Sequence, residues 1–434
     1  MTFIVLLVVL TALLYTGVPM FAVMFLFSAG VLILHEGSVG TLGEFVFSHL
    51  NVYLLVAIPL FMLMAHFMVR GKVVDDLYET AHTLVRHLPG GLGVATVFAC
   101  AVFSAISGSS VATALTIGAV AIPQMLKYNY DPRGVYGVVA GGGTLGILIP
   151  PSAPMVLYGV ASDTSIGALF MAGVLPGLMI AGIFAGWCML TERRRELRLG
   201  AVYTRPPRAS LGECLASLRK SFWALTAPPF VLGGMYFGIF TATEAAATGA
   251  LYALIIATVI YRKFGWRDLW EGGQEAARTT AMLFMIILGA GLFGHMLTKL
   301  GVPDALVKLA VNYDVSQTQF LIAMMVLIFL LGLVLESVSI ILITTPVITP
   351  VMTALGIDKV WYGVLLTINL ELALISPPVG MNLIVIKAIA KASIHEINLA
   401  AIPYMLMLAL GIALIIAFPQ IALWLPGTMD YKPG

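Results

Sequence analysis

Two apolar stretches of this chain hold helix-breaking residues at a depth where a membrane helix needs continuity. Residues 141–152 read GGGTLGILIPPS, and residues 369–382 read NLELALISPPVGMN. In a helix, Gly costs about 1 kcal/mol against Ala and Pro about 3 kcal/mol, and Pro also removes a backbone donor. Broken backbone inside a membrane is tolerated only where protein buries it or where it lines a wet cavity. Paired interruptions in two halves are typical of the binding site of a transporter built from an inverted repeat.

Composition sets the broad class. Of the 434 residues, 60% are hydrophobic and only 10% are charged, and apolar runs long enough to cross a bilayer recur along the chain. This pattern predicts an all-α polytopic membrane protein. The first 69 residues contain no Lys or Arg, so the first apolar run lacks the basic start of a cleaved signal peptide. Cys100, Cys188 and Cys214 form no close pair, which disfavours a disulfide framework or a zinc site.

The two halves of the chain share a register. An offset of 227 positions (377 − 150) superposes Pro150 and Pro151 on Pro377 and Pro378. Matches at Pro and Ser carry weight, because Leu, Val and Ala match by chance in apolar helices. We therefore expect two repeats of inverted topology. The same offset pairs Ser110 with Ser337, Pro123 with Pro350, Met125 with Met352 and Pro176 with Pro403.

The first repeat is expected over residues 1–190. Gly17 and Pro19 interrupt the apolar run 3–34, which predicts two short helices there, and residues 46–68 predict the next span. The segment Ser107-Gly108-Ser109-Ser110 is a turn signal between two arms too short to span a membrane, which predicts a re-entrant hairpin. In order, the expected elements are scaffold helices 3–68, an amphipathic interfacial arm 70–87, the hairpin 91–125, a broken helix 134–161 and a closing helix 166–190.

A basic hydrophilic linker, 191–220, is expected to join this repeat to the second one, 221–434. The scaffold helices of the second repeat, 222–298, are predicted as spans 222–240, 245–261 and 279–298, with a polar piece 262–278 before the last span. The expected elements that follow are an interfacial arm 300–314, a hairpin 316–354 with its tip at 336–339, a broken helix 360–391 and a closing helix 399–425.

Basic residues set the expected orientation. With the linker in the cytoplasm, 19 of the 23 Lys and Arg residues fall on the cytoplasmic side, as the positive-inside rule requires. The first hairpin then enters from the cytoplasm and the second from the opposite face. The N-terminus lies outside if residues 3–34 form two helices and inside if they form one.

Polar side chains gather at the predicted tips and breaks. Hydroxyl and amide groups, together with carbonyls freed by broken helices, supply the oxygen ligands that small hard cations such as sodium prefer. For any single Ser, capping a helix end or joining two helices is an equal alternative. The oxygen donors are Ser107, Ser109, Ser110 and Thr144 in the first repeat and Ser337, Ser339, Asn369 and Asn382 in the second.

Two carboxylates, Glu336 and Glu371, also fall in the apolar segments. An acid inside a membrane is functional by default, so either residue can ligate a cation or take a proton. The alternative is a supporting or interfacial acid, above all for Glu336 at the hairpin tip.

Five stretches of the chain carry a specific resemblance, and the likeness extends over essentially the whole chain. They read FSAISGSSVATALTIGAVAIPQM (103–125), GTLGILIPPSAPMVLYGVASDTSIGALFMAGVLPG (143–177), GIFTATEAAA (238–247), LESVSIILITTPVITPVM (335–352) and NLELALISPPVGMN (369–382). The chain thus resembles the large membrane subunit of tripartite ATP-independent periplasmic (TRAP) transporters, the DctM-like family. The resemblance implies a bacterial inner-membrane protein of the elevator type, with a scaffold and a moving transport domain. It also implies sodium-driven uptake of organic acids, a small four-helix membrane subunit (DctQ-like) and a soluble periplasmic binding protein (DctP-like).

The resemblance further implies sodium sites at the two tips and the breaks that face them. Sodium is the only coupling ion expected, no other metal or cofactor is expected, and the remaining partner is the lipid bilayer, not nucleic acid. The sodium sites map to Ser107, Gly108, Ser109, Ser110, Gly142, Gly143, Thr144, Ser337, Ser339, Asn369 and Gly380. Substrate contacts are expected from Ser109, Pro151, Ser152, Glu336, Pro378 and Asn382.

The expected function is a sodium-coupled importer of a small organic acid that a periplasmic binding protein delivers. A stand-alone sodium/dicarboxylate symporter of the same wider fold, which needs no binding protein, is the alternative. An integral membrane enzyme is disfavoured because no nucleophile–base pair or metal constellation is visible in the sequence. A channel is disfavoured because channels arrange charges or carbonyls in rings around an axis, whereas this repeat lies within one chain.

Overall fold

The computed structural model describes residues 9, 12–13, 16–36, 40–73, 75–199 and 207–429, and every regular element in these ranges is a helix. These ranges contain eight helical stretches that are long and apolar enough to cross a membrane. The all-α membrane class predicted from composition is confirmed.

The N-terminal scaffold is more interrupted than the sequence predicts. Helix α2 (Met20–Glu36) begins directly after the interruption expected at Gly17 and Pro19, while most of the shorter helix expected before it lies outside the described residues. The span predicted over 46–68 begins later than expected, since the stretch long and apolar enough to cross a membrane runs from Tyr53 to Arg70. Three elements share that region: α3 (Gly40–Leu50), the 3-10 helix η1 (Tyr53–Val56) and α4 (Ala57–Arg70).

The junction between α3 and η1 has a local cause. Val52 adopts an extended backbone, with φ −108° and ψ 112°, a conformation that suits a β-branched side chain. The polar residue Asn51 precedes it, outside both helices. The apolar composition of 46–68 therefore gives no sign of the break between α3 and η1.

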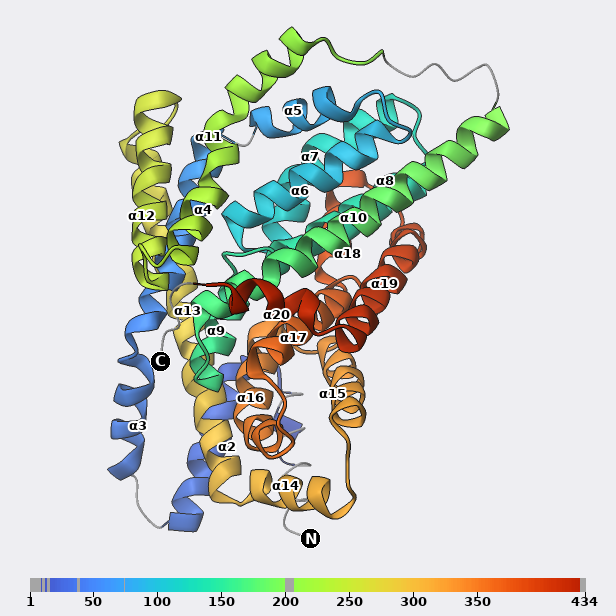
Figure 1. The fold of residues 1–434 in the computed structure, drawn as a ribbon. Helices are drawn as coiled ribbons and strands as arrows, with labels where there is room; N and C mark the ends of the chain where they lie inside the picture. The colour runs from blue at the N-terminus through green and yellow to red at the C-terminus, as the bar shows by residue number, and fades with distance from the viewer. Residues whose placement is uncertain are drawn as a thin grey trace.

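The next elements build the first hairpin and the first broken helix. Helices α6 and α7 meet at residues 108–109, and the backbone between α8 and α9 is non-helical at 149–152. In Figure 1, α6 and α7 lie beneath α5 at the upper end of the molecule. The bounds are α5 (Asp75–Val85), α6 (Gly91–Ser107), α7 (Ser110–Lys127), α8 (Pro132–Leu148), α9 (Ala153–Ser162) and α10 (Ile166–Leu199).

Helices enter the predicted linker 191–220 from both ends. Helix α10 continues to Leu199, and Glu192 and Arg195 form an i,i+3 ion pair at 3.5 Å in its last turns. Helix α11 (Leu211–Tyr236) contains the C-terminal end of the predicted linker. Arg, Glu and Leu all favour helix, which explains the extension.

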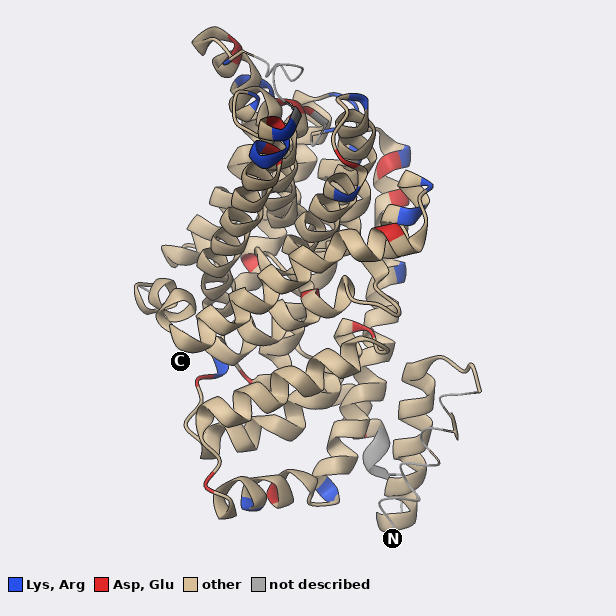
Figure 2. Cartoon of the chain, turned by 90° about the vertical axis from the view of Figure 1, so that its right-hand side faces the viewer, with Lys and Arg blue, Asp and Glu red and all other residues tan. Residues whose placement is uncertain are grey.

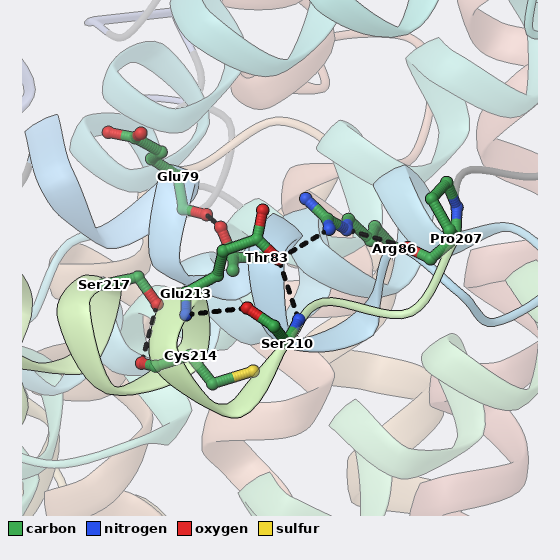
Figure 3. Close-up of polar contacts among 8 residues, drawn as sticks. All are labelled: Glu79, Thr83, Arg86, Pro207, Ser210, Glu213, Cys214 and Ser217. Carbon is green, nitrogen blue, oxygen red and sulfur yellow. Dashed lines mark hydrogen bonds and ion pairs between the residues drawn. The ribbon is translucent and has the colours of Figure 1, made fainter.

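The start of α11 is fixed by a capping box. The hydroxyl of Ser210 accepts from the Glu213 amide, and the Glu213 carboxylate accepts from the Ser210 amide. The Arg86 guanidinium reaches the same carboxylate at 2.9 Å and donates to the Pro207 carbonyl at 2.9 Å (Figure 3). Backbone and side-chain hydrogen bonds from Ser210, with the nearby Arg86 charge, hold the pKa of Glu213 below its usual value. The residue that follows α5 is thus tied to the first turn of α11.

The second half repeats the order of elements, with two corrections. The polar piece predicted over 262–278 is helical from Trp266 and continues without a break into the predicted span, because Glu and Arg pairs such as Arg267 and Glu271 at 2.9 Å support a helix. The closing helix predicted over 399–425 is divided at Phe418 and Pro419, where Pro cannot continue α19.

The bounds of these elements are α12 (Ala242–Ile255), the π-helical η3 (Ile256–Ile260), α13 (Trp266–Lys299), α14 (Val302–Asn312), α15 (Gln317–Gly332), α16 (Ser337–Ala354), α17 (Lys359–Leu374), α18 (Met381–Ala390), α19 (Ile394–Ala417) and α20 (Gln420–Gly427). Helices α15 and α16 lie beside α14 at the lower end in Figure 1, opposite to α6 and α7.

The two broken helices occupy the centre of the molecule. Every residue of α8 from Val135 to Leu148 is buried, and so is every residue of α17 from Trp361 to Glu371. Helix α8 packs against α6, α7, α17 and α19, whereas α13 packs against α2 and α4 and also against α16. Figure 2 shows that most charged residues gather at the end that holds α5 and that few lie at the opposite end.

Candidate transport site

The first hairpin tip packs directly on the first break. Gly108, between α6 and α7, has φ +59°, and a Cβ there would lie 2.5 Å from the carbonyl oxygen of Pro151. Only Gly fits this position, because it tolerates positive φ and has no side chain to clash. Ser109 then caps α7, with its hydroxyl accepting from the Ala112 amide at 3.3 Å. The tip and the Pro-Pro break are thus one packed unit.

Helix α8 approaches the same tip through its glycines. A Cβ at Gly146 would lie 2.5 Å from backbone atoms of Ser109 and Ser110. A Cβ at Gly142 would meet the sulfur of Cys100 at 2.8 Å, and one at Gly143 would meet the Cβ of Ala114 at 2.8 Å. The glycine run therefore lets α8 lie against both arms of the hairpin.

The hydroxyls of the first tip already have partners. Ser107 lies 3.1 Å from the Thr113 hydroxyl, which also donates to the Ser109 carbonyl at 2.8 Å. Thr144 donates to the Gly141 carbonyl of its own helix at 2.6 Å. These oxygens keep lone pairs that can accept a cation, since each hydroxyl has two.

Glu371 joins the second broken helix to the first half. Its carboxylate accepts from the Ser110 hydroxyl at 2.7 Å and 2.6 Å and from the Ile147 amide at 3.0 Å. Glu371 is fully buried and Ser110 is 2% exposed. Within the described ranges, no Lys, Arg or His lies within ion-pairing distance of this carboxylate. Hydrogen bonds from Ser110 and Ile147 hold it instead.

The sequence indicates that Glu371 is an intramembrane acid, but the expected ion and substrate ligands do not include it. The signal was present: the offset of 227 aligns Glu371 with Thr144, one of the expected ligands. What sequence could not supply was its partner, because Ser110 lies 261 positions away.

The second hairpin tip is more open than the first. Glu336 is exposed and precedes α16 with an extended backbone, whereas Ser339 is 4% exposed. Asn369 ties α17 to α15, since its amide donates to the Met325 carbonyl at 2.7 Å. A Cβ at Gly332 would lie 2.4 Å from the Cβ of Ala373. Ala373 is the offset partner of Gly146 (373 − 146 = 227), so both hairpins meet their broken helix at the same position.

The two breaks differ in burial. Pro151 and Ser152 are buried in the first break, while Pro378 is exposed in the second. Gly380, with φ +47°, starts α18. Ser337 is the first residue of α16 and stands where Ser110 stands in α7.

Two buried polar side chains at the breaks lack partners within the described protein. Neither amide atom of Asn382 forms a hydrogen bond, nor does the hydroxyl of Ser152, and both residues are 0% exposed. The Asn382 nitrogen lies 3.4 Å from the position of a Cβ at Gly143. Asn382 therefore reaches from the second break to the helix of the first. Buried polar groups are almost always hydrogen-bonded. A ligand that formed hydrogen bonds with these atoms would therefore supply the partners that they lack.

A cavity of about 410 Å³ lies between the scaffold and the hairpin-bearing helices. His49 of α3 and His295 of α13 line one side, and Leu157 of α9 and Pro346 of α16 line the other. The sequence did not predict this cavity, and its lining includes none of the expected ion ligands.

The family follows from a match across nearly the whole chain. The family profile described as "Tripartite ATP-independent periplasmic transporter, DctM component" matches residues 7–421. The chain belongs to the DctM family of TRAP transporters. It is 37% identical to the C4-dicarboxylate TRAP transporter large permease protein DctM of Pseudomonas aeruginosa, over 91% of each chain. It is also 37% identical to the protein of that name from Rhodobacter capsulatus, over 97% of this chain and 98% of that one.

Among solved structures, the YdaH transporter of Alcanivorax borkumensis has a TM-score of 0.67 at 14% identity, over 91% of this chain and 89% of that one. That likeness concerns the fold alone. Membership of the DctM family makes the chain a transporter permease subunit rather than an enzyme, and a multi-pass protein of the bacterial inner membrane. The resemblance read from the five sequence stretches is confirmed.

Proposed function

We propose that this chain is the large membrane subunit of a sodium-coupled secondary transporter that imports a small organic acid. The observation that carries the proposal is the meeting of the first tip, the first break and Glu371 at one buried place, next to the unpaired amide of Asn382. Broken helices at the centre of a membrane protein are the usual place for ion and substrate sites in such transporters.

Helix polarity favours a cation and an anion at neighbouring positions. Helices α6, α8, α15 and α17 all end at a tip or a break, so their last carbonyls lack intrahelical partners. These ends attract cations. Helices α7, α9, α16 and α18 begin at the same places, and their first amides attract anions.

The proposed sodium ligands come from both halves. Hydroxyl, amide and carbonyl oxygens are hard ligands that suit sodium. Ser107, Gly108, Ser109, Ser110, Gly142, Gly143 and Thr144 form the first set, and Ser337, Ser339, Asn369 and Gly380 the second. Glu371 acts on the first set as a positioning residue, because its bonds to Ser110 and Ile147 fix the tip against α8.

The proposed substrate is a small carboxylate, by analogy with the two C4-dicarboxylate relatives. Its contacts are assigned to Ser109, Pro151, Ser152, Glu336, Pro378 and Asn382. Among these, Ser152 and Asn382 have donors with no partner in the described protein, so they can bind carboxylate oxygens without first breaking another bond.

Two inverted repeats and an elevator motion complete the proposal. Supporting observations are the opposed ends at which α6–α7 and α15–α16 lie (Figure 1) and the common position of Gly146 and Ala373. The moving body comprises both hairpins and both broken helices, and the scaffold comprises residues 3–68 and 222–298. Separating a tip from its break would expose unpaired backbone to hydrocarbon, at several kcal/mol per group, so each pair should move as one.

A small membrane subunit and a periplasmic binding protein are the proposed partners, in keeping with the tripartite description of the family. The second candidate is a stand-alone sodium/dicarboxylate symporter. Uptake of a labelled C4-dicarboxylate into proteoliposomes separates the two. We expect uptake only with an inward sodium gradient, the small subunit and a binding protein. Sodium-driven uptake without the binding protein would favour the symporter, and uptake without sodium would contradict ion coupling.

A further inference from the structure

A second cavity opens beside the last turns of α10, and its lining includes no residue of either hairpin tip. Its volume is about 560 Å³, and it is lined by the first residues of α6 and α8, the loop before α8, the end of α10 and the first half of α19. The transport mechanism proposed above uses none of these residues.

The cavity has the charges of a phosphate site at its rim. Four arginines line it, and two acids, Asp131 and Glu192, lie among them, so the net charge is positive. Arg195 is held in place, since it donates to the Asn129 carbonyl and pairs with Glu192. The four are Arg133, Arg194, Arg195 and Arg198. Arginine is well suited to bind phosphate because its guanidinium donates two parallel hydrogen bonds.

The inner part of the cavity has a carboxylate that needs a donor. Glu192 is only 7% exposed. Its Oε1 is 3.5 Å from Arg195, but its Oε2 has no hydrogen-bond partner within the described protein. A buried carboxylate oxygen without a donor is costly, so a ligand with an ammonium group would stabilise this position.

An apolar stripe leads away from the cavity along α19. Leu399 lines the cavity and is 37% exposed, and Ile402 and Leu406 follow it at 45% and 66% exposure. Residues three and four apart share one face of a helix. Trp187 of α10 adds an aromatic ring to the cavity wall. The cavity therefore joins a charged rim to a surface suited to acyl chains.

We propose that this cavity binds a phospholipid with a primary ammonium headgroup, phosphatidylethanolamine. Its phosphate would lie on the arginine rim, its ammonium at Glu192 and one acyl chain along Leu399, Ile402 and Leu406. Phosphatidylglycerol would supply the phosphate but no cation for Glu192. Phosphatidylcholine would supply a cation without N–H donors. Basic pockets between transmembrane helices bind lipid headgroups in other membrane proteins.

Native mass spectrometry of the delipidated full-length chain tests this proposal. The probes are phosphatidylethanolamine, phosphatidylcholine and phosphatidylglycerol with identical acyl chains, and free O-phosphoethanolamine. We expect phosphatidylethanolamine to bind about tenfold more tightly than either other lipid, the size expected of one charge-assisted hydrogen bond. Equal binding of the three lipids would overturn the proposal. Equally tight binding of free O-phosphoethanolamine would also overturn it, in favour of a soluble ligand.

Matched variants locate the effect. Glu192→Gln should abolish the preference for phosphatidylethanolamine over phosphatidylcholine, whereas the Arg194→Gln/Arg198→Gln double variant should weaken binding of both lipids. Arg193→Gln is the control, because Arg193 is exposed on the same helix but does not line the cavity. A preference that survives Glu192→Gln, or that Arg193→Gln removes equally, would contradict the assigned site.

Discussion

The hydroxyl of Ser110 lies 2.7 Å and 2.6 Å from the two carboxylate oxygens of Glu371, across 261 positions of the chain. Ser110 opens α7 at the first tip, and Glu371 lies near the end of α17. The contact therefore fastens the second broken helix to the first hairpin. The amide of Ile147 adds a bond from α8 at 3.0 Å, so three elements converge on one carboxylate.

Glu371→Leu should lower both stability and uptake. Leu has no acceptor, so the Ser110 hydroxyl and the Ile147 amide lose the partner that they have in Glu371. Leaving a buried donor without a partner costs about 1–3 kcal/mol, and denaturation in detergent measures this loss. Ser110→Ala should also destabilise, and the double variant should lose less than the two single losses combined. Strict additivity would contradict a direct contact.

Gly146→Ala should disable transport although Ala favours helix more than Gly does. The added methyl would lie 2.5 Å from backbone atoms of Ser109 and Ser110, so the tip must move away from α8. We expect uptake to fall at least tenfold, the size of a barrier about 1.4 kcal/mol higher. Gly182→Ala on α10 is the control, since a Cβ there meets nothing within 4 Å. Equal uptake in the two variants would show that the close approach is not required.

Sequence patterns predicted the tips and the breaks, because each depends on local chemistry: Gly108 and the Pro-Pro pairs break helices wherever they stand. They did not predict the Ser110–Glu371 contact, since side-chain partners 261 positions apart are chosen by packing. They also misjudged helix continuity. The segment 46–68 is apolar throughout its helices yet divided at Val52, and the charged start of α13 is continuous with its apolar part.

Asn382 and Asn369 should respond differently to replacement by Leu. Asn382 makes no hydrogen bond within the described protein, so Asn382→Leu should keep or raise the unfolding midpoint while raising the KM for substrate. Asn369 donates to the Met325 carbonyl at 2.7 Å, so Asn369→Leu should destabilise by about 1 kcal/mol or more. Thermal unfolding and uptake kinetics on both variants measure this. A destabilised Asn382→Leu protein with normal KM would assign that amide a structural role.

Ser109→Ala and Ser337→Ala should weaken the sodium dependence of uptake by removing an oxygen ligand at each tip. Ser109 also caps α7, and losing an N-cap costs about 0.5–2 kcal/mol. Ser210→Ala removes the N-cap of α11, which lies outside the tips and breaks, and serves as the control for that cost. Sodium titrations of uptake should shift to higher concentration in the tip variants only. Unchanged titrations in both tip variants would remove these serines from the ion sites.

The central claim is that both hairpins and both breaks move as one body against the scaffold, and paired disulfides test it most directly. Helix α10 packs against α6 and α8 and is placed with this body. Within the body, Gly93→Cys would face native Cys188 of α10, with Cβ atoms 3.2 Å apart. Between body and scaffold, Gly294→Cys and Pro346→Cys would face each other, with Cβ atoms 3.3 Å apart. Both separations are near those of a disulfide.

The measurement is uptake before and after oxidation, with the other cysteines replaced and reductant added back as a control. The account predicts that the Gly93–Cys188 cross-link leaves uptake intact, whereas the Gly294–Pro346 cross-link stops it until the disulfide is reduced. Transport that continues with α13 joined to α16, and stops with α6 joined to α10, would contradict a rigid moving body.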